Sequence, residues 1–306
     1  MIGCSGNLTR YLLGKGAKVI CVEKDDRLFA AFCEEFKDEL ESKQLRIIHA
    51  DVLRWLLQRE KKLNALEAHG EKEKEQEQPQ EREESTTETE EEEEEDLDLI
   101  KFDKIVANLP FNITTDVLKF LLPRFSSMFR EKETSTAAGD VYLLLQDETA
   151  QRLTECSVGD TNYRAMNVFV DCYCSDREYL FKIDRKAFFP APNVDGALAH
   201  FKLVHHTEAL AVTGESASES DGKVKISTKQ FDTFVNQCFS RRRKMLKNNI
   251  PTNMYETEVV LQAIEEADSL TLQTRPQDIS HSQYLRLLHR LQTLKDQRLA
   301  SQRQQD

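Results

Sequence analysis

Two short apolar runs that flank an amphipathic segment limit the fold more than any other feature of this chain. The runs are Lys18–Val22 and Leu45–His49, and an acidic residue follows each of them closely. Between them, the apolar residues of Asp25–Leu40 recur every three to four positions, which is typical of a helix with one buried face. Strand, helix and strand at this spacing predict a right-handed βαβ unit and therefore a parallel sheet.

Strands and helices continue to alternate up to about residue 205. Further strands are expected over Phe102–Ala107, Val141–Leu145, Tyr163–Tyr173, Tyr179–Ile183 and Leu198–Leu203. Helices are expected from about Thr114 and over Asp147–Leu153. Beyond a polar stretch the periodicity predicts only helices, over Phe231–Asn248, Thr257–Glu266 and Ser282–Gln297. The expected fold class is therefore α/β, with a small helical domain at the C-terminal end.

One segment carries nearly all of the chain's negative charge. Residues 71–98 contain 16 acidic and 3 basic residues, a net charge of −13, whereas the whole chain of 306 residues has −12. The remainder sums to about +1, so the acidic balance does not argue against a nucleic-acid partner. Residues 60–98 hold too few apolar side chains to offset the entropy of ordering, so we expect a disordered insertion in a loop. A solvated loop without function is the simpler interpretation, and a specific acidic docking role is the alternative.

Several classes of protein are excluded by composition. The chain has no stretch of 18 consecutive apolar residues, so no membrane span is expected. The seven cysteines are odd in number and form no Cys-x-x-Cys pair. Neither a zinc ribbon nor a disulfide scaffold is therefore expected, and a reducing compartment is the default. The histidines show no ligand spacing, so no metal site is predicted, and the N-terminus resembles neither a signal peptide nor a transit peptide.

These patterns predict three parts. Residues 1–205 form an α/β domain that contains the insertion at 60–98, residues 206–222 form a linker, and residues 223–306 form the helical domain.

Three positions near the start suit an adenosine-containing ligand. The glycine turn Ile2-Gly-Cys-Ser-Gly6 opens a helix, where free backbone N–H groups can meet a ligand. Glu23 ends the next strand, about twenty residues later, where a carboxylate can accept from two ribose hydroxyls. Asp51 follows the third strand and could accept from an adenine amine. Each acid alone is more often a surface charge or a helix cap, but all three lie where open α/β sheets bind ligands.

The decisive motif is Asn108-Leu-Pro-Phe111, which follows the strand predicted over 102–107. Pro110 fixes the backbone angle φ and lacks an N–H, so the chain leaves the strand stiffly and its carbonyls can face a ligand. The Asn108 side-chain oxygen and a nearby carbonyl can both accept hydrogen bonds from an exocyclic amine. Phe111 offers a ring for base stacking, worth about 1–3 kcal/mol. The motif predicts a site that positions an amine, and the structural alternative is an ordinary turn with a core Phe.

At this point the chain resembles a known family. Asn108–Thr115 is similar to the target-amine motif of the ribosomal RNA adenine N6,N6-dimethyltransferases, which use S-adenosylmethionine. Further blocks resemble that family in the same order, at Leu145–Leu153, Tyr163–Arg164, Phe188–Asp195, Phe239–Asn249 and Thr274–Ile279. Residues 143–150 and 189–195 are most similar to the plastid branch. The resemblance implies a Rossmann-like class I methyltransferase sheet with a small C-terminal helical domain.

The resemblance also implies a role for each matching residue. Gly3, Glu23, Asp51 and Asn108 would bind S-adenosylmethionine: Gly3 at its methionine end, Glu23 at the ribose and Asp51 at the adenine amine. Asn108 and the Pro110 carbonyl would hold the amine of the target adenine.

Two phenylalanines complete the implied site. Phe111 would stack on the target base and Phe188 would flank it from the other side. A paired or stacked adenine must leave its stack to be methylated, so such a pocket is expected.

Two departures from the family concern the N-terminal end. The glycine turn is one residue shorter than the family's, and Met1 stands where the family has an acid. The family's upstream block is also absent from this sequence. We therefore expect an N-terminally truncated chain that binds S-adenosylmethionine poorly and has lost a targeting segment.

The run Arg241-Arg-Arg-Lys-Met-Leu-Lys247 carries five positive charges in seven residues on the predicted helix 231–248. We predict that Arg241, Arg242, Arg243, Lys244 and Lys247 contact RNA phosphates, although a solvated helix face is the alternative.

The predicted activity is methyl transfer to the N6 amines of adjacent adenosines in small-subunit ribosomal RNA. A catalytically impaired RNA-binding assembly factor is the first alternative, and an amine methyltransferase for proteins or small molecules is the second. The expected partner is small-subunit ribosomal RNA or a pre-ribosomal small subunit, with no membrane and no metal, and the protein is expected to be a monomer. A plastid is the expected location, with mitochondrion or cytoplasm as the alternatives.

Overall fold

The computed structural model describes residues 6–58, 102–108, 111, 114–125, 137–189, 191–204, 226–267 and 270–303. The acidic insertion, the linker predicted over 206–222, Gly3 and Pro110 lie outside these described residues. The division into domains at these places therefore stays a prediction.

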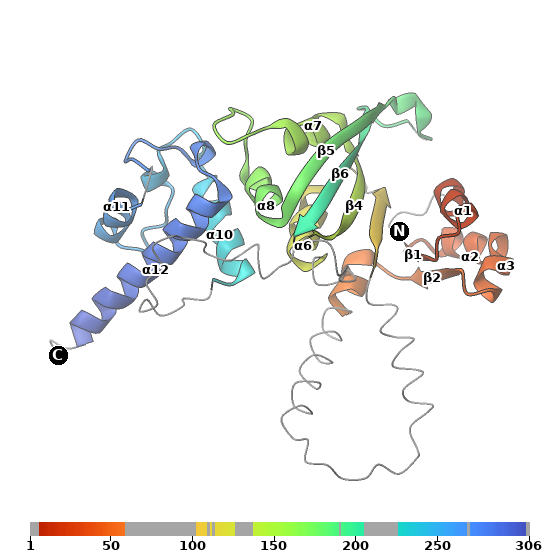
Figure 1. Cartoon of the computed structure of the whole chain (residues 1–306), viewed down its shortest axis with the longest axis horizontal. Coiled ribbons are helices and arrows are strands. Elements are labelled where there is room, and N and C mark those ends of the chain that lie inside the picture. Colours follow the sequence, from red (N-terminus) through yellow and green to blue (C-terminus); the bar gives the residue numbers. More distant parts are fainter. Residues whose placement is uncertain are drawn as a thin grey trace, which may run out of the picture.

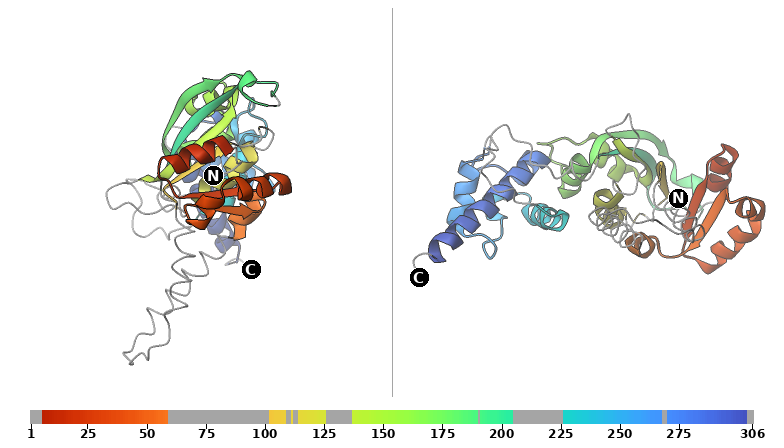
Figure 2. Two further views of the ribbon diagram at one scale, coloured as in Figure 1. Left: turned by 90° about the vertical axis from the view of Figure 1, so that its right-hand side faces the viewer. Right: turned by 60° about the horizontal axis from the view of Figure 1, so that its bottom comes forward.

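The chain forms an elongated molecule in which the elements follow one another roughly along its length (Figure 1). The N-terminal elements occupy one end, and the last helix reaches the other end (Figure 1 and the right view of Figure 2). The elements of the N-terminal end are α1 (Gly6–Gly14), β1 (Val19–Glu23), α2 (Asp26–Glu35), α3 (Lys37–Glu41) and β2 (Leu45–His49). The middle holds β3 (Lys104–Asn108), α6 (Thr114–Phe125), β4 (Ala137–Gln146), α7 (Asp147–Glu155), α8 (Ala165–Tyr173), β5 (Cys174–Ile183), the 3-10 turn η2 (Arg185–Ala187) and β6 (Gly196–Val204). The C-terminal end holds α10 (Thr228–Cys238), η3 (Leu246–Asn248), α11 (Thr257–Glu265), η4 (Pro276–Asp278) and α12 (His281–Arg303).

The strands form two groups. β1 and β2 pair in parallel, with Glu23 opposite His49, so the predicted βαβ unit with a parallel sheet is confirmed. The second group has the order β3-β4-β6-β5. β3 is parallel to β4, whereas β6 runs antiparallel to both β4 and β5. The predicted α/β class with C-terminal helices is therefore confirmed.

Two hydrophobic clusters hold these groups together. The smaller one lies between α1, α2 and the β1–β2 pair and includes Leu13, Phe32 and Leu45. The main core extends from Leu56 to Leu294 and joins the four-stranded sheet to the C-terminal helices. Removing such apolar surface from water stabilises the fold by about 25 cal/mol per Å², so the C-terminal helices contribute to the stability of the sheet region.

α8 corrects one prediction. The aromatic and β-branched side chains of residues 163–173 predict a β-like segment, but Ala165–Tyr173 is a helix. Seven of its nine residues are buried, and α6, α7, α10 and α12 all pack around it. A helix that is covered on almost every side has no amphipathic period, so its sequence cannot be told from that of a buried strand.

Two predicted helices are shorter than expected. The helix predicted over Asp25–Leu40 divides into α2 and α3 at Phe36, whose φ of −110° and ψ of 35° are not helical. The helix predicted over 231–248 ends at Cys238, and the basic run forms turns instead. Like charges three or four positions apart on a helix repel one another, which disfavours continuing the helix through this run.

Most cysteines are free, as the sequence suggests. Cys33, Cys156, Cys172, Cys174 and Cys238 are free thiols, whereas Cys21 is disulfide-bonded, which the cysteine spacing did not predict. Within the described ranges, every helix is too short or too polar to cross a bilayer. The same residues contain no cluster of three His, Cys, Asp or Glu side chains suited to a metal ion.

Candidate active site

The structure brings Glu23 and Asp51 together at the carboxyl ends of β1 and β2. Ala50 N–H donates to the Glu23 carbonyl at 3.0 Å, which ties the two strand ends. The Glu23 carboxylate is half-buried, and its Oε1 accepts from the backbone N–H groups of Lys24 at 2.8 Å and Asp25 at 2.9 Å. Both amides bind one oxygen, so the orientation of the carboxylate is fixed.

Asp51 has two roles in the structure. Its Oδ1 accepts from the N–H groups of Leu53 at 3.1 Å and Arg54 at 3.3 Å, so it begins the helix over 52–58. Its Oδ2 pairs with Lys24 Nζ at 3.1 Å. The hydrogen bond from Lys24 holds the pKa of Asp51 below its usual value. The helix-cap interpretation of this acid is therefore correct, and the 41% exposure of its side chain leaves it accessible to a ligand as well.

Asn108 and Phe188 lie toward the same edge of the four-stranded sheet. Asn108 is the last residue of β3, is half-buried, and lies opposite Leu144 of β4. A Cβ atom placed on Gly196 would lie 3.3 Å from both Leu144 Cδ1 and Phe188 Cζ. The Phe188 ring therefore rests close to the backbone of β6, beside the leucine that Asn108 faces. Residues 80 positions apart in the chain are brought to one edge of the sheet.

The loop that carries Phe188 is tied to the sheet by an ion-paired network. Lys182 Nζ lies 3.0 Å from Asp147 Oδ2 and 2.9 Å from Asp195 Oδ2. Asp195 Oδ1 also accepts from Arg185 N–H at 3.1 Å, and Tyr179 OH donates to Asp147 at 2.8 Å. The hydrogen bond from Tyr179 lowers the pKa of Asp147, and that from Lys182 lowers the pKa of Asp195. Both carboxylates are thus held ionised at the base of the loop.

The remaining predicted residues fall in two places. Phe111 is half-buried in a turn three residues after Asn108. Arg241, Arg242, Arg243 and Lys244 are exposed, and Lys247 is half-buried. The roles assigned to all of these residues stay predictions.

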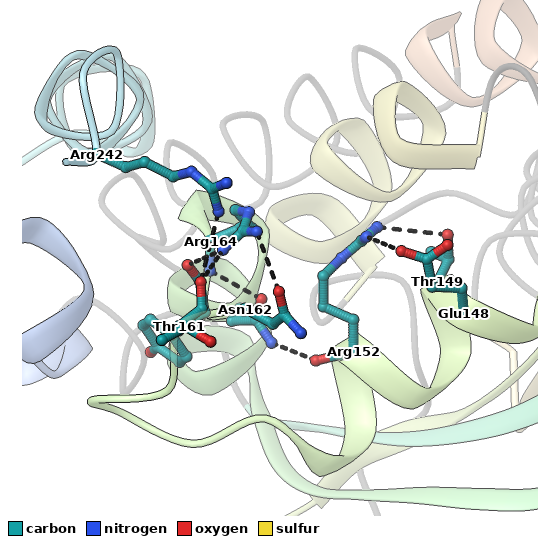
Figure 3. Close-up of polar contacts among 9 residues, drawn as sticks. Glu148, Thr149, Arg152, Thr161, Asn162, Arg164 and Arg242 are labelled. Carbon is teal, nitrogen blue, oxygen red and sulfur yellow. Dashed lines mark hydrogen bonds and ion pairs between the residues drawn. The ribbon is translucent and has the colours of Figure 1, made fainter.

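Sequence reasoning missed the residues that shape the site without forming a motif of their own. Gly196, Lys182 and Asp147 lie inside or next to blocks of the family pattern, but only the register of β4, β5 and β6 shows what they contact. Arg164 stands out in the sequence only as part of a block, although it lies close to Arg242 in space (Figure 3).

Comparison with known proteins identifies the family. The model of the ribosomal RNA adenine dimethylase family matches residues 3–293. The chain belongs to this family. It is therefore a ribosomal RNA adenine dimethyltransferase, and the predicted family and activity are confirmed. Methyltransferases of this kind use S-adenosylmethionine as the methyl donor.

Individual relatives agree with this assignment. The chain is 30% identical to the chloroplastic ribosomal RNA small subunit methyltransferase of Arabidopsis thaliana over 283 residues, which cover 92% of this chain and 67% of the relative. It is 29% identical to ribosomal RNA small subunit methyltransferase A of Chlamydia trachomatis over 290 residues, covering 94% of this chain and 79% of that protein. The crystal structure of a dimethyladenosine transferase from Plasmodium falciparum has a TM-score of 0.60 at 21% identity, covers 95% of this chain and 88% of that chain, and supports the fold.

Proposed function

We propose that the dimethyltransferase activity of this protein acts on the N6 amines of adjacent adenosines in small-subunit ribosomal RNA, with Asn108 at the reacting nitrogen. The observation that carries this proposal is the position of Asn108 at the carboxyl end of β3, with Phe188 close by across Leu144. The half-buried amide of Asn108 would provide a hydrogen-bond acceptor for an amine, and the Phe188 ring toward the same sheet edge would provide a face for its base.

Glu23 and Asp51 fit the adenosine part of S-adenosylmethionine. A carboxylate whose orientation is set by two backbone amides suits a pair of ribose hydroxyls, and Asp51 retains an exposed oxygen for the adenine edge. Lys24 Nζ, whose side chain is 75% exposed, can move away from Asp51 into solvent when a ligand approaches. Bound S-adenosylmethionine supplies a methyl group on a positively charged sulfur.

Asn108 would act by positioning. Its side-chain oxygen would accept one N–H of the target amine and the Pro110 carbonyl the other, so that the nitrogen lone pair is directed toward the methyl group. The amine would release a proton to solvent. Bringing two reactants into the right geometry lowers the barrier by as much as about 7–11 kcal/mol. Phe111 and Phe188 would hold the base by stacking.

The test is methyl incorporation into small ribosomal subunits that lack this modification, with radiolabelled S-adenosylmethionine. Asn108→Ala should reduce the rate at least about 100-fold because it removes one of the two acceptors that orient the amine. The control is Asn253→Ala, which removes an exposed asparagine from a surface turn and should leave the rate unchanged.

Binding to RNA and to S-adenosylmethionine is measured on the same variants, so that a loss of rate can be assigned. Wild-type methylation by Asn108→Ala would refute the proposal. RNA binding by the wild-type protein without any methyl transfer would instead favour the impaired assembly factor.

The location and assembly of the protein belong to the same proposal. We place it in a plastid, because the chloroplastic relative of Arabidopsis thaliana matches 92% of the chain. Action as a monomer, without a metal ion, on free ribosomal RNA or on a pre-ribosomal small subunit stays a prediction.

A further inference from the structure

Three arginines from separate elements lie in one region, where Arg164 and Arg242 share the Thr161 carbonyl and Arg152 is directed toward Thr149 and Glu148 (Figure 3). Arg152 belongs to the last turn of α7, Arg164 directly precedes α8, and Arg242 lies in the turns after α10. Arg164 Nη1 donates to the Thr161 carbonyl at 2.7 Å, and Arg242 Nη1 approaches the same oxygen at 3.5 Å. We call these three residues the arginine cluster.

Positive charge in the arginine cluster is poorly balanced. Among the described residues, Arg164 donates to the carbonyls of Thr161 and Tyr163 and to the side-chain oxygen of Asn162, which are all neutral. Arg152 lies 3.8 Å from Glu148, but the Glu148 side chain is 92% exposed. Burial, followed by the charges of Arg242 and Arg152, lowers the pKa of Arg164. Arg164 is therefore repelled by both of the other arginines, and the cluster would gain from a bound anion.

A buried asparagine fixes the backbone under two of these arginines. Asn167 is fully buried, its Nδ2 donates to the Arg152 carbonyl at 2.6 Å, and its Oδ1 accepts from Arg164 N–H at 3.1 Å. The turn that carries Arg242 is held in a similar way, because the buried Asn249 donates to the neighbouring Arg241 carbonyl at 3.2 Å. The backbones that carry the cations are thus fixed before any ligand arrives, which reduces the entropy lost on binding.

We infer that the arginine cluster binds a backbone phosphate of the substrate RNA, an inference that rests on the proposed function. Guanidinium groups match the spacing of phosphate oxygens and bind them in pairs of hydrogen bonds. Arg242 of the cluster is also a sequence neighbour of the exposed basic residues Arg241, Arg243 and Lys244. One RNA strand could therefore contact the cluster and these residues together. Arg152 and Arg164, from the middle of the chain, thereby join the C-terminal basic run in one phosphate site.

The alternative is a purely structural role. The hydrogen bond from Arg242 to the Thr161 carbonyl links the C-terminal region to the loop before α8, and it could serve only to hold the two together. A structural link would affect thermal stability but not the number of phosphates that the protein neutralises, and these two effects can be measured separately.

The experiment measures the affinity of the full chain for an unmodified transcript of the small-subunit ribosomal RNA at several salt concentrations. Arg164→Gln and Arg242→Gln should each weaken binding about 10-fold, the effect of losing one charge-assisted hydrogen bond. The slope of log affinity against log salt should become shallower by about 0.7–0.9 for each phosphate that the variant no longer neutralises. The double variant should lose clearly less than the product of the two single losses, because both arginines serve one phosphate.

Two further variants complete the design. Arg152→Gln leaves the Thr161 carbonyl contacts intact and should weaken binding in the same direction without lowering the melting temperature. Arg298→Gln is the matched control, because Arg298 is neutralised by Glu256 and Glu258 and should not affect RNA affinity.

Unchanged affinity and salt slope in the three cluster variants would overturn the inference, and so would losses that multiply in the double variant. Its failure can be distinguished from failure of the proposed function. If the protein methylates RNA but its RNA affinity is unchanged in the cluster variants, only the phosphate site is refuted. Arginine-dependent RNA binding without methylation refutes only the proposed activity.

Discussion

Gly196→Ala offers a sharp test of whether Phe188 belongs to the reacting site. Gly196 pairs with Gln146 of β4 and Ile183 of β5, so its backbone is held from both sides. An added Cβ would lie 3.3 Å from Phe188 Cζ and from Leu144 Cδ1, and 3.5 Å from the Leu145 carbonyl oxygen. Because the paired strands hold the Gly196 backbone in place, the Phe188 ring and the Leu144 methyl group must shift by a few tenths of an ångström.

The expected effect is larger on catalysis than on stability. A misplacement of about 1 Å can reduce a rate about 100-fold, so a shift of a few tenths should reduce methyl transfer by about 3- to 10-fold. The free energy of unfolding should change by less than about 1 kcal/mol, because the entropy that alanine removes from the unfolded chain offsets mild overpacking.

The effect on catalysis is measured by single-turnover methylation at saturating RNA, and the effect on stability by urea denaturation of the same protein. Gly14→Ala is the matched control, since an added Cβ at the end of α1 has open space within 4 Å and should leave the rate unchanged. A wild-type rate for Gly196→Ala would refute the reasoning, because it would mean that the Phe188 ring does not touch the reacting base.

Two further predictions concern the framework of the site. Asn167→Ala leaves the Arg152 carbonyl and the Arg164 N–H without their partner, at about 1–3 kcal/mol each, and should lower the melting temperature by about 2–4 °C per kcal/mol in calorimetry. A change below about 1 kcal/mol would contradict the account of the buried amide. Lys182→Met should destabilise the protein by an amount that is constant from about pH 5 to pH 9. The difference in stability between wild type and variant should then shrink gradually as the pH falls below about 4, because Asp147 and Asp195, whose pKa values are lowered from 3.8, lose their charge over this range. It should shrink again above the ordinary lysine value of 10.5, because Asp195 and Asp147 raise the pKa of Lys182. Urea denaturation at pH 3, 7 and 9 measures the plateau and its acid side, and a difference at pH 3 as large as that at pH 7 would contradict the prediction.

Much of the fold follows from local sequence patterns. β2 begins and ends at the predicted residues, and Lys18–Val22, Asp147–Leu153 and Thr257–Glu266 each lie within two residues of an observed element. These segments have a clear period or clear boundaries, such as the hydrogen bonds from Arg27 and Leu28 N–H to the Asp25 side chain at the start of α2. Where the observed structure differs from the prediction, tertiary contacts determine the secondary structure. α8 is surrounded by other helices, and its apolar run lacks the pattern that marks an exposed face.

The candidate site was predictable to the extent that it lies at strand ends. Glu23, Asp51 and Asn108 each follow an apolar run and lie at or just beyond the carboxyl ends of parallel strands, Glu23 and Asp51 in the β1–β2 pair and Asn108 in the four-stranded sheet. The approach of Phe188 to Gly196 and the convergence of Arg152, Arg164 and Arg242 could not be predicted. They depend on antiparallel register and on helix packing between distant segments, which no spacing in the sequence encodes.

The core that runs from the four-stranded sheet into the C-terminal helices has a consequence for substrate choice. Phe169 of α8 packs edge-on against Phe231 of α10 at 6.2 Å, within a core that both regions share. The separation between Asn108 and Arg242 is therefore set by packed side chains. If the arginine cluster holds a phosphate, as inferred above, only adenosines at a fixed distance from that phosphate would reach the proposed amine-binding residues. Selectivity for neighbouring adenosines can then arise from distance, without reading the identity of the bases around them.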